Sequence, residues 1–224
     1  MPCLLRKKEH KDVVIECLES VKLFSPGAEL IVVDDGSPLS TKFLNKYADL
    51  VIHHTKSKGI AFGWNNGIKL AKGDYIVVIN DDIVARPGWI EAMLKGFETE
   101  GAMVTAPSVE HMAAGTGIKV DHTWFPGSCF MLSKKTIKEI GYFDEQFAPF
   151  NYEDVDYWTR ICKAGGKMVR NYAIQVRHKE GDVIHKFEGG GEINDANRER
   201  YIKKWGFDPI KVFYWKTDVF PWQK

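Results

Sequence analysis

The segment Tyr75-Ile76-Val77-Val78-Ile79-Asn80-Asp81-Asp82 joins a run of apolar, mostly β-branched residues to an amide and two carboxylates. Its length and composition, and the turn-forming residues on either side, predict a buried strand. Ligands of open α/β sheets bind outside the carboxyl ends of the strands, which is where these acids fall. The segment therefore predicts a sheet with a binding site at this edge.

Two adjacent carboxylates repel one another unless something compensates their charge. A hard cation such as Mg²⁺ or Mn²⁺, placed between the acids and substrate phosphates, makes the arrangement favourable. The alternative is an Asx turn that ends the strand, which Asn and Asp form readily. The residues alone leave both interpretations open.

The segment Glu29-Leu30-Ile31-Val32-Val33-Asp34-Asp35-Gly36-Ser37 repeats the same pattern of an apolar strand that ends in two acids. Hydrophobic periodicity predicts further helices and strands on both sides of it. The expected helices are Val13–Leu23, Thr41–Tyr47, Trp89–Phe97 and Lys134–Ile140, and the expected strands are Leu50–His54 and Ala102–Pro107. Strands that alternate with helices at this spacing predict βαβ units and an α/β fold with a mainly parallel central sheet.

Two segments are expected to be loops. Lys58–Gly67 contains three separated glycines, which could let the backbone approach a phosphate before a helix begins; a loose turn is the alternative. Ser108–Asp121 is rich in Gly, Ala and His without periodicity, which is typical of a mobile loop over a site.

A third group of acids, Glu153, Asp154 and Asp156, stands at the start of a predicted helix and follows several aromatic residues. The helix dipole favours acids in a first turn by up to about 1 kcal/mol each, which accounts for one or two of them. A carboxylate that aromatic neighbours desolvate is also a better proton acceptor. The group therefore holds a candidate general base.

The composition is that of one globular domain with 224 residues, 44% of them hydrophobic and 27% charged. With 31 basic and 30 acidic residues, the chain has no excess positive charge for nucleic acid. Its cysteines are widely spaced, so we expect an intracellular protein in which they are reduced and buried for structural reasons. No stretch has the length of a membrane span. We expect a cytoplasmic protein, compatible with peripheral membrane association, and nothing indicates an oligomeric state.

Five motifs in this order resemble family 2 glycosyltransferases of the GT-A fold, over about Pro2 to Gly206. The motifs are Val32–Ser37, Gly59–Gly67, Asn80–Asp82, Gly141–Glu145 and Glu153–Asp156, the last followed by Arg160 and Gly165. The resemblance implies a single GT-A (Rossmann-like) catalytic domain in residues 1–206. The aromatic-rich tail, residues 207–224, is then expected to pack back onto the domain.

The resemblance implies a role for each matching residue on the donor side. Asp35 matches the acid that contacts the nucleotide base, with Asp34 beside it. Asn80-Asp81-Asp82 occupies the metal motif, in which Asp82 matches the metal-binding acid. Gly59 is expected to lie beside the donor.

On the acceptor side, the resemblance makes Asp154 the general base of an inverting reaction and Glu153 the residue that orients the acceptor. Gly127 is expected beside the substrate. His178 matches a histidine that completes the metal and phosphate site, and His185 is its competitor.

Two features depart from the family pattern. The first strand before Pro2 is shortened or missing: either the sequence starts downstream of the start of the full gene product, or the sheet has lost an edge and the nucleotide pocket is altered. Trp64 stands where many relatives carry a phosphate-binding Arg, and its indole has one N–H donor and no charge.

The resemblance implies an inverting glycosyltransferase that depends on Mn²⁺ or Mg²⁺. Its donor is expected to be a UDP- or dTDP-sugar, and its acceptor a hydroxyl of a glycan, a lipid-linked or a protein-linked molecule. The alternatives are a sugar-nucleotide-binding or scaffold protein that has lost turnover, and a retaining transferase on the same fold.

Overall fold

The computed structural model describes residues 1–110, 117–121, 127–179 and 189–214. The helices are α1 His10–Phe24, α2 Ile60–Leu70, α3 Trp89–Glu100, α4 Lys134–Ile140, α5 Glu153–Lys163 and α7 Gly190–Trp205, with shorter turns η1 Lys42–Lys46, η2 Glu145–Phe147 and η3 Ile210–Tyr214. The strands are β1 Pro2–Cys3, β2 Ile31–Asp34, β3 Leu50–His53, β4 Tyr75–Ile79, β5 Ile83–Val84, β6 Val104–Val109, β7 Ile118–Asp121, β8 Cys129–Ser133 and β9 Met168–His178.

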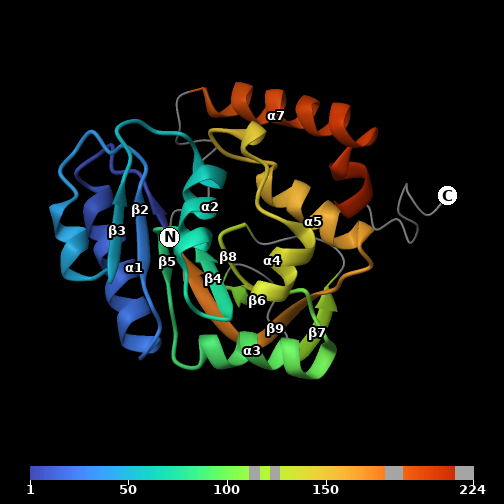
Figure 1. Ribbon diagram of the computed structural model, residues 1–224, viewed down its shortest axis with the longest axis horizontal. Helices are drawn as coiled ribbons and strands as arrows, with labels where there is room; N and C mark the ends of the chain where they lie inside the picture. Colours follow the sequence, from blue (N-terminus) through green and yellow to red (C-terminus); the bar gives the residue numbers. More distant parts are fainter. Residues whose placement is uncertain (111–116, 122–126, 180–188, 215–224) are drawn as a thin grey trace.

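The strands form two sheets that lie side by side (Figure 1). The first has the order β1-β2-β3 and is parallel throughout. The second has the order β4-β8-β6-β9-β5, with β7 on β9, and in it only β6 and β9 run parallel. The α/β class is therefore confirmed, whereas the second sheet is mixed rather than mainly parallel. Apolar periodicity marks a strand but carries no information on its direction, so the sequence could not show this.

The first strand is present as two buried residues. Pro2 and Cys3 pair in parallel with Val33 and Asp34, and the Met1 ammonium donates to the Ile31 carbonyl at 3.0 Å. This short pairing still fixes the start of the chain beside β2.

The predicted glycine loop Lys58–Gly67 is wrong, because α2 begins at Ile60. A Cβ on Gly63 would lie 2.9 Å from Pro2 Cβ, and one on Gly67 would lie 3.9 Å from Val33 Cγ2. The helical glycines therefore let α2 approach the first sheet closely rather than making room for a phosphate. Gly59 alone precedes the helix, with φ 99°.

Trp64 belongs to the core and not to a phosphate site. Its side chain is 3% exposed, and its ring centroid lies 4.9 Å from that of Phe143 and 5.7 Å from that of Phe130. The departure from the family pattern at this position is therefore a packing feature of α2.

The predicted loop Ser108–Asp121 is also partly wrong. Strand β6 continues to Val109 and β7 begins at Ile118, while residues 111–116 lie outside the described part. The segment expected as a helix at Thr41–Tyr47 forms a 3₁₀ turn, η1.

The described beginning of the tail contacts the domain. Phe207 and Val212 pack against the hydrophobic cluster that surrounds α5, and Val212 is 8% exposed. Residues 215–224 lie outside the described part, so the division at residue 206 stays a prediction. The four cysteines are free thiols. Among the described helices, none combines the length and apolarity that a bilayer crossing requires.

Candidate active site

Asp35 follows β2 and is saturated with hydrogen bonds. Its carboxylate is 4% exposed and accepts from His54 Nδ1 at 2.9 Å and from Ser57 Oγ at 2.7 Å. The backbone N–H groups of Lys58 and Gly59 each donate to it at 3.0 Å. Asp35 therefore fixes the segment that leads into α2.

Asp34 has a similar environment. It accepts from the backbone of Ser37 at 3.0 Å, from Thr41 Oγ1 at 2.7 Å and from His53 Nδ1 at 2.9 Å. Burial alone would raise the pKa of Asp34, but these hydrogen bonds outweigh it and lower the pKa below its ordinary value. Both acids of this pair thus have structural partners, and their proposed contact with a nucleotide stays a prediction.

The side chains of the Asn80-Asp81-Asp82 motif point in different directions. Asp81 Oδ1 lies 3.7 Å from His10 Nε2, and its carboxyl accepts a hydrogen bond from the Cys3 thiol, so it faces β1 and α1. Burial raises the pKa of Asp81 to about 6. Asn80 Oδ1 is buried and has no hydrogen-bond partner among the described residues. It is therefore available to a ligand.

Asp82 and His178 face each other across the β5–β9 pair. Asp82 Oδ1 lies 3.1 Å from His178 Nε2, and the Lys179 N–H donates to the Asp82 carbonyl at 3.0 Å. Two ligands at right angles around Mg²⁺ are about 2.9 Å apart, since each bond is about 2.0–2.1 Å. The pair fits a divalent cation whose other ligands come from substrate phosphates and water.

Asp82 and His178 supply fewer ligands than a metal centre built from protein side chains alone. Within residues 1–110, 117–121, 127–179 and 189–214, no group of three or more His, Cys, Asp or Glu side chains could hold a metal ion. His185 lies outside the described residues. A cation shared with a diphosphate needs only one or two protein ligands, which agrees with Asp82 and His178.

Asp154 lies in the first turn of α5 and has few hydrogen-bond donors. The Val155 N–H donates to its Oδ1 at 2.8 Å. A Cβ on Gly127 would lie 2.3 Å from its Oδ2, so only glycine fits against this carboxylate. Burial raises the pKa of Asp154 to about 6. The group is therefore ionised at neutral pH but more basic than an exposed Asp.

Glu153 is more deeply buried than Asp154. Its side chain is 4% exposed, and its Oε2 has no hydrogen-bond partner in the described part of the chain. Burial, together with the nearby Asp154 charge, raises the pKa of Glu153 well above its ordinary value. Glu153 therefore stays protonated, and able to donate a hydrogen bond, to a higher pH than an exposed glutamate.

Asp156, the third acid of the group, has a structural role. It is fully buried and accepts from Arg160 Nε at 3.0 Å, from Lys204 Nζ at 2.5 Å and from Trp205 Nε1 at 2.9 Å. Asp156 therefore joins α5 to the end of α7.

Backbone contacts bring these separate acids to one region. The Asn80 N–H donates to the Ser128 carbonyl at 2.9 Å, and the preceding Gly127 lies against Asp154. The structure therefore places the end of β4 next to the start of α5. That Asp82 and Asp154 serve one site stays a prediction.

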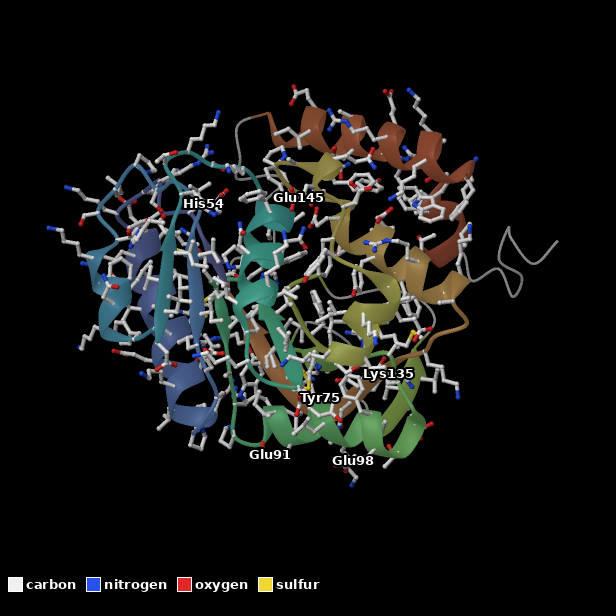
Figure 2. All side chains as sticks on the ribbon, viewed as in Figure 1. His54, Tyr75, Glu91, Glu98, Lys135 and Glu145 are labelled. Carbon is white, nitrogen blue, oxygen red and sulfur yellow. The ribbon has the colours of Figure 1, made fainter. Side chains whose placement is uncertain are left out.

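A second set of contacts joins the end of β2 to the same site. Gly59 is bonded to Asp35, and the next N–H, that of Ile60, donates to the Pro149 carbonyl at 2.9 Å. Pro149 lies just before α5. Figure 2 shows His54 at this end of the molecule, far from Tyr75 at the start of β4.

Two residues of this region were not found from the sequence. His10 approaches Asp81 from α1, and Asn197 of α7 donates to backbone carbonyls just before α5. Both contacts join segments far apart in the chain, and neither residue belongs to a local motif that could have revealed them.

Comparison with known proteins identifies the family. The sequence profile described as Glycosyl transferase family 2 matches residues 1–158. The chain is 26% identical to the pre-mycofactocin glycosyltransferase of Mycobacterium tuberculosis over 168 residues, which cover 63% of this chain and 35% of that protein. It is 26% identical to the glycosyltransferase YwdF of Bacillus subtilis over 201 residues, which cover 79% of this chain and 71% of YwdF.

Solved structures show the same fold. A crystal structure of GalNAc-T7 with UDP, GalNAc and Mn²⁺ matches with a TM-score of 0.70 and 16% identity, covering 90% of this chain and 47% of that one. The S. aureus TarS structure of residues 1–349 matches with a TM-score of 0.61 and 13% identity, covering 94% and 74%. The chain spans about a third of the length of its mycobacterial relative. The profile match and the architecture together show that this chain belongs to glycosyl transferase family 2 and has the GT-A fold.

Proposed function

We propose that the protein transfers a sugar from a nucleoside diphosphate sugar to an acceptor hydroxyl, with inversion, and that Asp154 is the general base. The observation that carries this proposal is the Asp154 carboxylate itself. It is half-buried, accepts a hydrogen bond from the Val155 N–H, and lies against Gly127 next to the end of β4. A base must have free acceptor capacity beside the place where the donor binds, and this arrangement supplies it.

The reaction requires one positioned proton acceptor. As the acceptor oxygen forms its bond to the anomeric carbon, the bond from that carbon to the diphosphate oxygen breaks, and the hydroxyl proton passes to Asp154. A carboxylate with a pKa of about 6 is ionised at neutral pH and still takes up the proton efficiently. Attack opposite the leaving group inverts the anomeric centre. Glu153, whose pKa is raised by burial, is proposed to orient the acceptor.

Asp82 and His178 are proposed to hold Mn²⁺ or Mg²⁺. When bound, such an ion stabilises the negative charge that develops on the departing diphosphate. The 3.1 Å separation of the two side chains, whose facing atoms are both buried, supports this assignment. The GT-A neighbour GalNAc-T7 was crystallised with UDP and Mn²⁺. Asp34, Asp35, Gly59 and Asp81 are proposed to line the nucleotide side.

The identity of the donor and the acceptor follows from the same proposal. We expect a UDP- or dTDP-sugar as donor, and a glycan, lipid-linked or protein-linked hydroxyl as acceptor. A lipid-linked acceptor would bring the protein to a membrane surface as a peripheral component.

Thermal unfolding with a panel of UDP-, dTDP- and GDP-sugars, with and without Mn²⁺, tests the donor site. A ligand at a hundred times its dissociation constant stabilises the folded state by about 2.7 kcal/mol. We expect a Mn²⁺-dependent rise in Tm with one nucleotide, and its loss in Asp82→Ala. The absence of any shift in the intact protein would contradict the proposal and favour a scaffold protein.

A further inference from the structure

Helix α7 places one buried amide over the segment that precedes α5. Asn197 is fully buried in this interface. Its Nδ2 donates to three backbone carbonyls, those of Phe147 at 2.7 Å, Phe150 at 2.8 Å and Asn151 at 3.1 Å. Arg200 Nη1 donates to the amide oxygen of Asn197 at 2.5 Å, which agrees with the nitrogen facing the carbonyls.

These carbonyls belong to a strained piece of backbone. Asn151 and Tyr152 have φ 71° and 74°, the left-handed region that residues with a Cβ rarely adopt. Such residues cost about 1–3 kcal/mol each and persist only where the surroundings hold them. Tyr152 is immediately followed by Glu153 and Asp154, so the left-handed turn sets the direction in which α5 starts.

Carbonyl oxygens repel each other when they converge, so this turn needs a hydrogen-bond donor at its centre. The amide of Asn197 supplies that donor from another element, α7. On its other side the same segment is held by α2, through the Ile60 N–H and the Pro149 carbonyl. Loss of the Asn197 amide would therefore remove the donor that these three carbonyls share and favour relaxation of the turn.

We propose that Asn197 is a positioning residue for Asp154: by gathering the three carbonyls, it holds the left-handed turn that places the Asp154 carboxylate against Gly127. The proposal rests on the proposed function, in which Asp154 is the base. Asn197 touches no reacting atom, so its effect passes through the geometry of α5. Displacement of a catalytic group by about 1 Å can cost about 100-fold in rate.

The test compares Asn197→Asp with Tyr201→Phe. Asn197→Asp keeps the size of the side chain but turns an oxygen toward the carbonyls. Tyr201→Phe removes another buried bond between α7 and α5, that of Tyr201 with Thr159 at 2.5 Å, one turn beyond Asp154. The donor is the one identified by thermal unfolding, and its turnover is measured either as hydrolysis by water or as transfer to an acceptor at a saturating concentration. Asn197→Ser, which is smaller and keeps one donor, replaces Asn197→Asp if the latter does not fold.

We expect Asn197→Asp to lower kcat by about 10- to 100-fold while the donor KM changes by less than about 2-fold. Tyr201→Phe should lower Tm and leave kcat within about 2-fold. A purely structural role would instead give both variants a lower Tm and the same kcat.

The measurement is repeated in an Asp154→Asn background, where Asn197→Asp should reduce the remaining turnover by less than about 2-fold, because the two residues act as a unit. An equal loss in both backgrounds, or an unchanged kcat in folded Asn197→Asp, would overturn the inference alone. Absence of turnover in the intact protein, or turnover unaffected by Asp154→Asn, would overturn the proposed function as well.

Discussion

The acids after β2 and the acids at the start of α5 look alike in sequence but have opposite surroundings. Asp34 and Asp35 accept hydrogen bonds from side chains and backbone N–H groups, and the pKa of Asp34 is lowered. Glu153 is buried and Asp154 half-buried, both have few donors, and the pKa of each is raised. The number of hydrogen-bond donors around a carboxylate, rather than its burial, decides whether it stabilises the fold or stays available for chemistry.

Acids close together in helix α5 also differ in how many hydrogen-bond donors surround them. Asp156 lies two residues after Asp154 and is fully paired by Arg160, Lys204 and Trp205. The acids of α5 thus divide into one that joins helices and two that have few hydrogen-bond donors. Each prediction below changes one side of this comparison.

The largest effect is expected for Asp154→Asn. Loss of the base should lower kcat by about 10³-fold, while the free energy of unfolding stays the same or rises, because a buried charge is removed. Initial rates and urea unfolding measure the two quantities. Asp156→Asn is the matched control: it should cost about 1–3 kcal/mol of stability and far less activity. The reverse pattern would mean that the roles of the two acids have been exchanged.

Asp35→Ala is expected to affect stability first. The substitution leaves the buried Gly59 N–H and the partly buried Lys58 N–H without their acceptor, which should lower the free energy of unfolding by about 3 kcal/mol. Chemical denaturation provides the measurement. A variant as stable as the parent would show that water replaces the carboxylate as the hydrogen-bond acceptor. Asp35 would then not stabilise the fold, which would contradict the contrast drawn between it and Asp154.

Gly127→Ala should act on Asp154 directly. The added Cβ would meet the Asp154 carboxylate at 2.3 Å, so the base must move and kcat should fall by about 10- to 100-fold. Gly191→Ala is the control, because a Cβ there meets nothing within 4 Å. Equal rates for the two variants would contradict the placement of Gly127 against the base.

The smallest effect is a difference in how stability depends on pH. Asp34 has a lowered pKa, so it contributes stability above its unfolded value, which is lost as the pH falls through the folded pKa. Asp154 has a folded pKa of about 6, so its contribution is greatest at low pH and is lost as the pH rises from about 4 to about 6. Asp34→Asn should therefore become relatively more harmful as the pH rises, and Asp154→Asn relatively less harmful.

Unfolding free energies of the two variants and the parent, measured from about pH 2 to pH 7 so that the range includes the lowered pKa of Asp34, check this prediction. Parallel curves for both variants would show that the two carboxylates titrate alike in the folded protein.

The sequence predicted the features of the fold that depend on local residue patterns. The apolar runs ending in Asp34 and Asn80 are strands, as their composition indicates. The prediction from sequence failed where a residue's contacts are with residues distant in the chain. Gly63 suggested a loop, but it faces Pro2 in a helix, and Asn197 has no local signal because the carbonyls it binds lie about 50 residues away.

The dependence of kcat/KM on pH tests the central claim most directly. Release of nucleoside diphosphate from the bound donor is measured from pH 4.5 to pH 8 with the intact protein and with Asp154→Asn. We predict an acid limb with an apparent pKa near 6 in the intact protein, and a low rate without that limb in the variant. A variant that keeps both the rate and the limb would contradict the assignment of Asp154 as the base.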